Sequence, residues 1–238
     1  MDVETPIEIA VFPLPEKVCF PGQSVDLHIF EPRYVQMVND CIDHGRLLGI
    51  AIAQKVISSP PESSPHHPFR NLTTYEPRPI FGAGKVEITK SLPDGRLLIE
   101  VQIIDRFQLT ETLQDIPYLL GKAIPLHDIP DPPSESSNYF TALWATCRHI
   151  FKERFVYFEK SIDKEAILLQ DLTLLTFSVF QWVRLTPSLM QWALETTSPV
   201  SRAKLLIEAM AEFAKNESKP ESEKGADVIK VDFRSNEH

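Results

Sequence analysis

The sequence predicts an α+β protein in which a small barrel of about six strands with one helix precedes a bundle of helices. Two observations predict this order. Short apolar runs separated by prolines fill the first half of the chain, and apolar residues at helical spacing fill the second half. Of the 238 residues, 43% are hydrophobic and 24% are charged, which is close to the average of globular domains. The chain can therefore bury a substantial core.

Six runs in the first half have the apolar content and the flanking turn residues of β-strands, namely 7–12, 25–30, 47–54, 80–89, 96–108 and 119–126. Pro93-Asp94-Gly95 is typical of a tight turn, so the two runs beside it should pair as a hairpin. Six short strands and a single helix favour a closed or half-closed barrel.

The helix expected among these strands begins at Pro32, because proline suits the first helical position. Gly45 should end it after His44. Five apolar residues fall on one face of this helix: Tyr34, Met37, Val38, Cys41 and Ile42. We expect this stripe to pack on the sheet, with Tyr34 as a buried anchor.

Helical spacing begins after a proline-rich stretch at 129–137, which predicts a boundary between a domain at 1–128 and another at 138–214. Beyond it we expect a helix through 140–151, a long apolar helix around 167–183, and two helices that start at Thr186-Pro187 and Ser198-Pro199. Two polar segments, 58–68 and the charged tail 215–238, should be mobile, and the alternating residues 228–233 of the tail could dock on another protein.

The formal net charge of -9 disfavours partners such as nucleic acid or anionic lipid, because both require a field of lysine and arginine. Cys19, Cys41 and Cys147 are too widely spaced for a disulfide framework or a CxxC site. The N-terminus is acidic where a signal peptide would be basic, and no segment is typical of a membrane span. These features predict a cytoplasmic protein with no membrane partner.

No catalytic, cofactor-binding or metal-binding residue can be assigned from the sequence. The Gly82-Ala83-Gly84-Lys85 run fails the phosphate-loop pattern and is interpreted as a closely packed strand, and His66-His67 has no second ligand pair at zinc-like spacing. The other candidates have the simpler interpretation of capping or helix-surface residues: His149 with Cys147 or Glu153, Ser188, Ser201 and Asp171. Asp171 is expected on the polar stripe of its helix, with a buried functional carboxylate as the alternative.

Three segments together resemble the opening of the N-terminal, substrate-binding domain of the ATP-dependent Lon proteases: Phe12-Pro13-Leu14-Pro15, Val18-Cys19-Phe20-Pro21-Gly22 and Leu27-His28-Ile29-Phe30-Glu31-Pro32-Arg33-Tyr34. The likeness continues through Leu48-Gly49-Ile50-Ala51, Gly82-Ala83-Gly84, Asp94-Gly95-Arg96 and Arg106-Phe107, and more faintly through Leu194-Glu195 and Ser201-Arg202. It covers roughly residues 6 to 214.

The resemblance implies a PUA-like pseudo-barrel followed by a helical bundle. It supplies ten signature residues as candidates for polypeptide binding: Pro13, Phe20, Pro21, Gly22, Phe30, Glu31, Pro32, Arg33, Tyr34 and Arg106. Most of them are expected to serve the architecture. Arg33 should brace the barrel by pairing with Glu31 or Asp26, and Asp26 stands where the family usually has proline, which should leave the second strand more exposed.

The resemblance also implies binding without catalysis, because full Lon proteases carry an ATPase P-loop and a Ser-Lys dyad that this sequence lacks. We therefore expect a non-enzymatic module, without cofactor, that binds unfolded or degron-bearing polypeptides, in some cases together with a protease. An apolar surface formed by Phe140, Trp144, Trp182 and Trp192 would suit that role. The alternatives are a PUA-like RNA-binding module, which the net charge of -9 disfavours, and an enzyme with an unfamiliar site.

Overall fold

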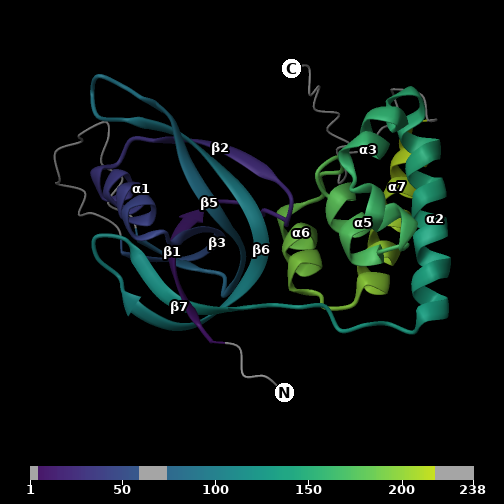
Figure 1. The fold of residues 1–238 in the computed structure, drawn as a ribbon, viewed down its shortest axis with the longest axis horizontal. Helices are drawn as coiled ribbons and strands as arrows, with labels where there is room; N and C mark the ends of the chain where they lie inside the picture. The colour runs from purple at the N-terminus through teal and green to yellow at the C-terminus, as the bar shows by residue number, and fades with distance from the viewer. Residues whose placement is uncertain (1–4, 59–73, 218–238) are drawn as a thin grey trace. The chain divides into compact units, whose positions relative to one another are not determined.

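A computed structural model describes residues 5–58 and 74–217 of the chain, which divides into two units, Met1–Leu126 and His127–His238 (Figure 1). The described residues of the first unit form strands and one helix, and those of the second unit form helices. The α+β class predicted from the sequence is confirmed. Of the segment 58–68 that was predicted to be mobile, Ser58 instead ends a strand, and the rest lies outside the described residues, as do the His66-His67 pair and the tail beyond residue 217.

The first unit is a seven-stranded sheet that closes on itself. Its strands are β1 (Ile7–Leu14), β2 (Ser24–Ile29), β3 (Leu47–Ser58), β4 (Thr74–Pro77), β5 (Ile80–Ser91), β6 (Leu97–Gln114) and β7 (Leu119–Pro125). They follow the order β1-β7-β6-β5-β3-β4, and a parallel pairing of β1 with β3 closes the barrel. Strand β2 lies beside β6 and pairs with it in antiparallel register.

All six predicted strands are present, and two differences have physical reasons. Strand β6 runs to Gln114 rather than Gln108, because its outer half pairs with β7 although few of its side chains there are buried. Strand β4 was not predicted, since its four residues form a short edge on β3 and carry no apolar alternation. The β5–β6 hairpin has the predicted turn, in which Gly95 adopts a left-handed φ of 84°.

Helix α1 (Pro32–His44) begins and ends at the predicted residues, and Gly45 takes the left-handed conformation at its C-cap. Its buried face consists of Tyr34, Met37, Val38 and Cys41. The prediction that Ile42 shares this face is wrong, because its side chain is 44% exposed. At 100° per residue, Ile42 lies nearly a quarter turn from the centre of the stripe, where solvent reaches the helix.

The core of the first unit has two clusters, one on each side of β1. Ala10 and Phe12 belong to the cluster that includes the buried face of α1, whereas Ile9 and Val11 belong to a second cluster with Phe81. Alternate residues of a strand point to opposite faces, so both faces of β1 are buried. This explains why its sequence is a nearly unbroken apolar run.

The second unit contains α2 (Pro133–Phe151), the short 3-10 helix η1 (Lys152–Arg154), α3 (Phe155–Ser161), α4 (Lys164–Leu168), α5 (Leu172–Val179), α6 (Pro187–Glu195) and α7 (Pro199–Glu217) (Figure 1). Helix α2 begins inside the stretch 129–137 that was predicted to be a boundary without structure, and α7 continues through Lys215, which was predicted to belong to the tail. No helix among the described residues is long and apolar enough to cross a membrane.

The prediction of one long helix around 167–183 is wrong. Helix α4 ends at Leu168, Gln170 adopts a left-handed φ of 51°, and α5 starts afresh at Leu172. Asp171 causes this break, because its carboxylate accepts a hydrogen bond of 3.0 Å from the backbone N–H of Leu174 and caps α5. Asp171 is therefore a capping residue, neither on the polar stripe of a helix nor a buried functional carboxylate.

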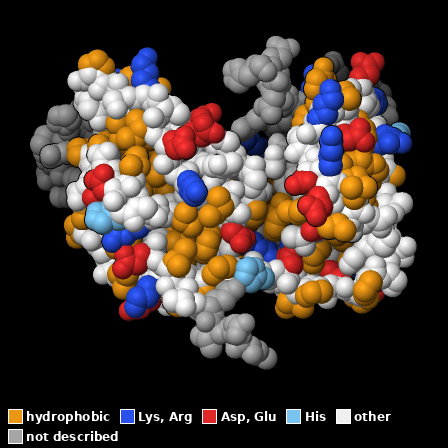
Figure 2. Space-filling view, in the orientation of Figure 1, with side chains coloured by type: hydrophobic (Ala, Val, Ile, Leu, Met, Phe, Trp, Pro, Cys, Tyr) orange, Lys and Arg blue, Asp and Glu red, His pale blue; other side chains and the backbone are white. Residues whose placement is uncertain are grey.

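The predicted aromatic surface is mostly the core of the bundle. Phe140 is buried and stacks on Trp144, whose ring also meets Phe155 edge to face at 5.2 Å. Trp182 meets Phe158 edge to face and contacts the tilted ring of Phe151. Of the four predicted residues only Trp192 is exposed, and apolar surface on this unit comes instead from leucines such as Leu168 and Leu169. Figure 2 shows hydrophobic side chains interspersed with charged ones on the face that it draws.

Candidate functional site

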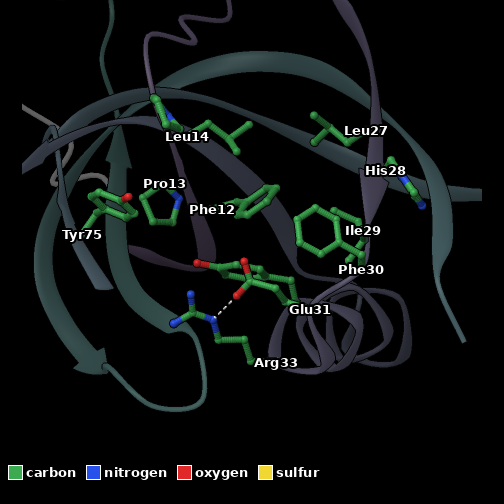
Figure 3. A pocket seen from close by; sticks show the side chains of 12 residues that line it. Phe12, Pro13, Leu14, Leu27, His28, Ile29, Phe30, Glu31, Arg33 and Tyr75 are labelled. Carbon is green, nitrogen blue, oxygen red and sulfur yellow. Dashed lines mark hydrogen bonds and ion pairs between the residues drawn. The ribbon is translucent and has the colours of Figure 1, made fainter. Parts of the chain in front are cut away.

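A cleft of about 240 Å³ opens between the end of β1 and the strand β2 (Figure 3). All of its lining residues belong to the first unit. Four consecutive residues come from the end of β1 and the position after it, seven from β2, the start of α1 and the two residues between them, and one from β4. They are Phe12, Pro13, Leu14, Pro15, Leu27, His28, Ile29, Phe30, Glu31, Arg33, Tyr34 and Tyr75.

The walls of the cleft are apolar and stiff. Phe12 lies 4.4 Å from Tyr34 between ring centroids, so the two rings form one surface. Phe30 stands at the rim with 42% of its surface exposed, and its ring meets that of His28 at 6.1 Å. Pro13 has a fixed φ and no N–H, so this wall is preformed. An apolar side chain can enter the cleft without first ordering its walls.

A buried ion pair forms the polar end of the cleft. Glu31 is only 7% exposed, and its carboxylate accepts a hydrogen bond of 2.8 Å from Nε of Arg33. The guanidinium of Arg33 also lies 4.5 Å from the centre of the Tyr34 ring. Burial raises the pKa of the Glu31 carboxyl above its ordinary value, and the nearby positive charge of Arg33 offsets part of this rise.

The size and chemistry of the cleft suit side chains better than a cofactor. Its volume of about 240 Å³ lies below the range of about 300–1,000 Å³ that is usual for small-molecule sites. Within the described residues, no group of three His, Cys, Asp or Glu side chains could hold a metal ion. Burial raises the pKa of the Cys19 thiol to about 11 and that of Cys41 to about 12, so neither is a ready nucleophile.

Five of the ten signature residues line the cleft: Pro13, Phe30, Glu31, Arg33 and Tyr34. The expected pairing of Arg33 with a carboxylate is present, with Glu31 as its partner. Asp26, the other carboxylate considered, is exposed on β2, in agreement with the expected exposure of that strand. Tyr75 completes the cleft from β4, and no signal in the sequence pointed to it.

The other five signature residues serve the barrel. Pro32 occupies the first position of α1, and Phe20 is fully buried. Gly22 adopts a left-handed φ of 83°, and its N–H donates to the carbonyl of Ile103 at 2.9 Å, which fixes the bend that it forms with Pro21. Arg106 is buried on β6, and its Nε donates to the carbonyl of Leu126 at 2.8 Å.

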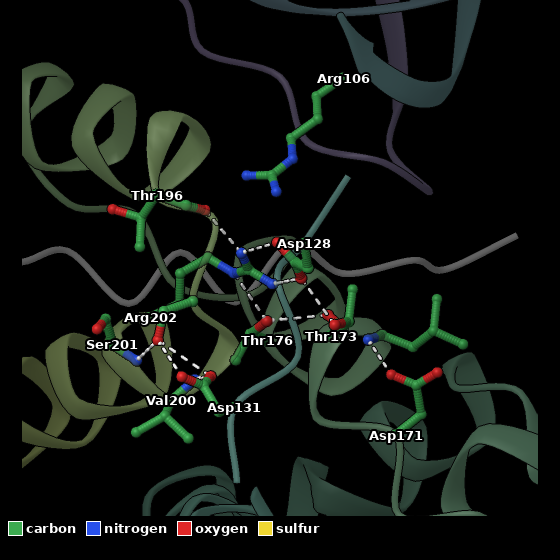
Figure 4. A network of polar contacts seen from close by, with 12 residues as sticks. Arg106, Asp128, Asp131, Asp171, Thr173, Thr176, Thr196, Val200, Ser201 and Arg202 are labelled. Carbon is green, nitrogen blue, oxygen red and sulfur yellow. Dashed lines mark hydrogen bonds and ion pairs between the residues drawn. The ribbon is translucent and has the colours of Figure 1, made fainter. Parts of the chain in front are cut away.

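The second unit contains a buried polar network around Arg202, which is fully buried (Figure 4). Both terminal nitrogens of its guanidinium donate to the carboxylate of Asp128, and its Nε donates to the hydroxyl of Thr176 at 3.1 Å. One terminal nitrogen also donates to the carbonyl of Thr196. The guanidinium stacks on the ring of Phe177, 4.3 Å away. A bidentate pair with this many partners is typical of a structural brace.

A second carboxylate in the same segment holds the start of α7. Asp131 accepts hydrogen bonds of 2.8 Å from the Ser198 hydroxyl and from the backbone N–H of Val200. The Ser198 oxygen in turn accepts from the N–H of Ser201, as its capping position predicted. Thr186, predicted to cap α6 in the same manner, makes no side-chain capping bond. Arg202 had appeared only as a faint family likeness, and its acidic partner was not foreseen.

The first unit is a closed barrel with a preformed apolar cleft, and the second unit is a bundle of helices. Residues 8–212 match the family described as the ATP-dependent protease La (LON) substrate-binding domain. The match covers most of the chain, which therefore belongs to this family.

Two curated relatives place this chain against one part of a longer protein. Lon protease 1 of Herpetosiphon aurantiacus is 26% identical over 131 residues, which are 55% of this chain and 15% of that protein. The Lon protease of Parabacteroides distasonis is 26% identical over 147 residues, or 60% of this chain and 16% of the relative. The matched region thus spans about one sixth of these proteases.

Solved structures share the fold. The Lon N-terminal domain protein from Xanthomonas campestris aligns with a TM-score of 0.55 at 19% identity, covering 85% of this chain and 98% of that one. The N-terminal domain of a Mycobacterium avium complex Lon protease aligns with a TM-score of 0.60 at 13% identity, covering 87% and 99%. At these identities the likeness establishes the architecture, and the chemistry of the cleft has to be argued from its own residues.

Proposed function

We propose that this chain binds apolar segments of other polypeptides in the cleft between β1 and β2. One observation carries the proposal: five signature residues of a substrate-binding family come together at one preformed apolar cleft. The cleft can take one or two side chains, and the rim residue Phe30 offers exposed aromatic surface beside it. Burial of such surface stabilises a complex by roughly 25 cal/mol per Å².

In this proposal the chain is not an enzyme and needs no cofactor. It captures unfolded or degron-bearing polypeptides, and it acts as an adaptor that delivers them to a protease. The family description, which names a substrate-binding domain of a protease, supports the second step. The RNA-binding alternative has no observation in its favour, since the net charge is -9 and a row of carboxylates crosses the sheet at Asp26, Glu100 and Glu87.

The proposal is tested by comparing two substitutions of equally exposed apolar residues. Phe30 lines the cleft and is 42% exposed, whereas Ile42 lies on α1 away from the cleft and is 44% exposed. Binding of fluorescein-labelled casein, an unfolded polypeptide, is measured by anisotropy. We expect Phe30→Ala to weaken binding about tenfold, as loss of an aromatic anchor does. We expect Ile42→Ala to leave it within about twofold.

Equal effects of the two substitutions would contradict the proposed site, because general surface hydrophobicity would then explain the binding. Thermal unfolding of both variants is the folding control. Neither should unfold more than a few degrees earlier than the parent, since surface substitutions usually change stability by less than about 0.5 kcal/mol.

A further inference from the structure

The outer edge of β2 carries backbone hydrogen-bonding groups that the barrel does not use. The N–H of Ile103 on β6 donates to the carbonyl of Gln23 at 2.9 Å. This bond shows which alternate residues of β2 form backbone hydrogen bonds with β6. Bonding alternates along an antiparallel pair, so Val25, Leu27 and Ile29 bond to β6. The N–H and C=O groups of Asp26 and His28 therefore point away from β6. Within the described residues of the first unit, no strand pairs with this edge.

The cleft opens along the same edge. Leu27, His28, Ile29 and Phe30 are consecutive and all line it, so the backbone of β2 borders the cleft together with side chains from both faces (Figure 3). The opposite wall is the end of β1, whose pairing with β7 stops at Val11. This wall contains two prolines and has few N–H donors. An incoming chain would find backbone partners on the β2 side and apolar contact on the other.

The charges beside this edge favour a basic partner. Asp26 is opposite Glu100, and Glu100 is opposite Glu87, so three carboxylates form a row across β2, β6 and β5. Like charges directly opposite each other in a sheet repel. The lysines that flank the row, Lys85 and Lys90, lie on β5, two strands away from the edge. A lysine or arginine placed next to Asp26 would extend the row with the opposite charge.

We propose that an extended segment of another polypeptide adds to the outer edge of β2 as a further strand, with apolar side chains in the cleft and a basic side chain beside Asp26. This inference rests on the proposed function and adds the mode and sequence preference of binding. A second copy of this chain lacks this charge complementarity in the register that sets the two Asp26 residues opposite each other, because their carboxylates would repel.

The pleat of the added strand defines the pattern that it should carry. In the added strand, residues opposite Asp26 and His28 would point their side chains to the outer, solvent-exposed face of the sheet. The residues between them would point their side chains to the face that carries Val25, Leu27 and Ile29. The preferred segment thus alternates apolar and basic residues. Backbone bonds supply affinity for many sequences, and the alternate side chains select among them.

The backbone half of the proposal is tested with two N-methylated peptides and the intact chain. The parent probe is a short, end-blocked, fluorescein-labelled peptide that alternates valine and lysine. One variant is methylated on every lysine nitrogen and the other on every valine nitrogen, because only one alternating set of N–H groups can face β2. We expect one set to abolish measurable binding, with a loss of at least about tenfold, and the other set to change it less than about threefold. Equal losses for both sets overturn strand addition.

The preference for a basic partner is tested by reversing the charge of two residues of the same carboxylate row, one at a time. Asp26→Lys changes the edge, whereas Glu87→Lys makes the same change in net charge two strands away. We expect Asp26→Lys to weaken the valine–lysine peptide about tenfold and to strengthen a valine–glutamate peptide, with a clearly smaller effect of Glu87→Lys. Equal effects of the two reversals overturn the assignment of a basic partner to this edge.

The result distinguishes this inference from the proposed function. If Phe30→Ala weakens the parent peptide while both methylated peptides bind alike, the cleft binds polypeptide through side chains alone and strand addition is wrong. If the parent peptide binds equally well to the Phe30→Ala variant, the assignment of the binding site to this cleft, and with it the proposed function, is wrong. Concentration-dependent sedimentation of the chain without peptide, with loss of self-association in Asp26→Lys or Phe30→Ala, would overturn the proposal in favour of a second copy as the occupant.

Discussion

At Tyr34 two roles meet in one side chain, because the ring is buried against the barrel and also lines the cleft. Only 8% of the residue is exposed, and its ring contacts that of Phe12. We expect Tyr34→Ala to lower the free energy of unfolding by about 3–5 kcal/mol, as other large-to-small changes of buried aromatic residues do. Urea unfolding measures this loss.

The control for Tyr34 is Tyr34→Phe, which keeps the ring and removes only the hydroxyl. The hydroxyl interacts with Arg33, so its removal should lower stability by about 1 kcal/mol. If Tyr34→Ala unfolds within about 0.5 kcal/mol of the parent, Tyr34 is a binding residue on the cleft surface and no core anchor.

Glu31 predicts a pH dependence whose sign follows from its burial. The pKa of its carboxyl in the folded chain is raised above the ordinary value of 4.5, so the folded state holds the proton more tightly than the unfolded state. Stability from this residue is therefore present below pH 4.5 and is lost as the pH rises through the folded pKa. Glu31→Gln, which stays neutral, should lack this loss.

Denaturant unfolding of the parent and of Glu31→Gln at several pH values from about 4 to 7 measures the difference between their unfolding free energies. We expect the difference to shift in favour of the Gln variant with rising pH and then to level off. A shift in favour of the parent would mean that the ion pair with Arg33 dominates over burial and that the pKa of Glu31 is lowered.

At the scale of the elements, close backbone packing makes Gly84 irreplaceable in β5. A Cβ atom at this position would lie 1.7 Å from the carbonyl oxygen of Gln102 on the paired strand β6. Backbone on a paired strand cannot move aside without opening the ladder. We expect Gly84→Ala to lower stability by about 3 kcal/mol or more, or to prevent folding.

Gly45 is the matched control for that substitution. A Cβ there meets nothing within 4 Å, and only its left-handed φ of 64° opposes a side chain. Gly45→Ala should therefore lower stability by about 1 kcal/mol. Thermal and urea unfolding of both variants compare the two costs. Similar values for the two variants would contradict the steric argument at Gly84.

Elements could be predicted where one local rule sufficed. Pro32 and Gly45 mark the ends of α1 by their own backbone preferences, and Pro93-Asp94-Gly95 marks its hairpin turn. Prediction failed where a local polar bond competed with apolar periodicity. Asp171 caps α5 and divides an apolar stretch that otherwise suits one long helix.

The site could be predicted only in part, for a related reason. The resemblance pointed to Pro13, Phe30 and Arg33, which lie in short segments of the sequence. Tyr75 reaches the cleft because it lies on β4. One edge of β2 pairs with β6, whose residues lie about 75 positions later in the sequence, and the opposite edge of β2 stays open. Both features depend on long-range pairing, which no local pattern in the sequence encodes.

At the scale of the whole molecule, the two units have different tasks. The cleft is lined by residues of the first unit, and the residues that bond to the buried Arg202 belong to the second unit. The sequence predicted a first domain that ends at residue 128 and a second domain that begins at residue 138. Asp128, which that prediction assigned to the first domain, bonds to Arg202, and Asp131, which it assigned to the boundary, bonds to the start of α7. We propose that the second folding unit begins at His127 instead.

The boundary is tested with two fragments of the second unit that both keep helix α2 whole. One fragment covers 127–217, and the other starts at Pro132 and lacks Asp128 and Asp131. Removing Asp128 takes away the bidentate partner of the fully buried Arg202, and loss of one partner of a buried pair costs about 3–5 kcal/mol. Small domains are stable by only about 5–15 kcal/mol. We therefore expect a cooperative thermal transition for 127–217 and a weak or absent one for the shorter fragment.

The control is Asp128→Asn in the longer fragment, whose unfolding midpoint should lie between those of the two fragments, because an amide keeps one acceptor and loses the charge. Equal midpoints for the two fragments would show that the segment is a passive linker and that the bundle folds without it.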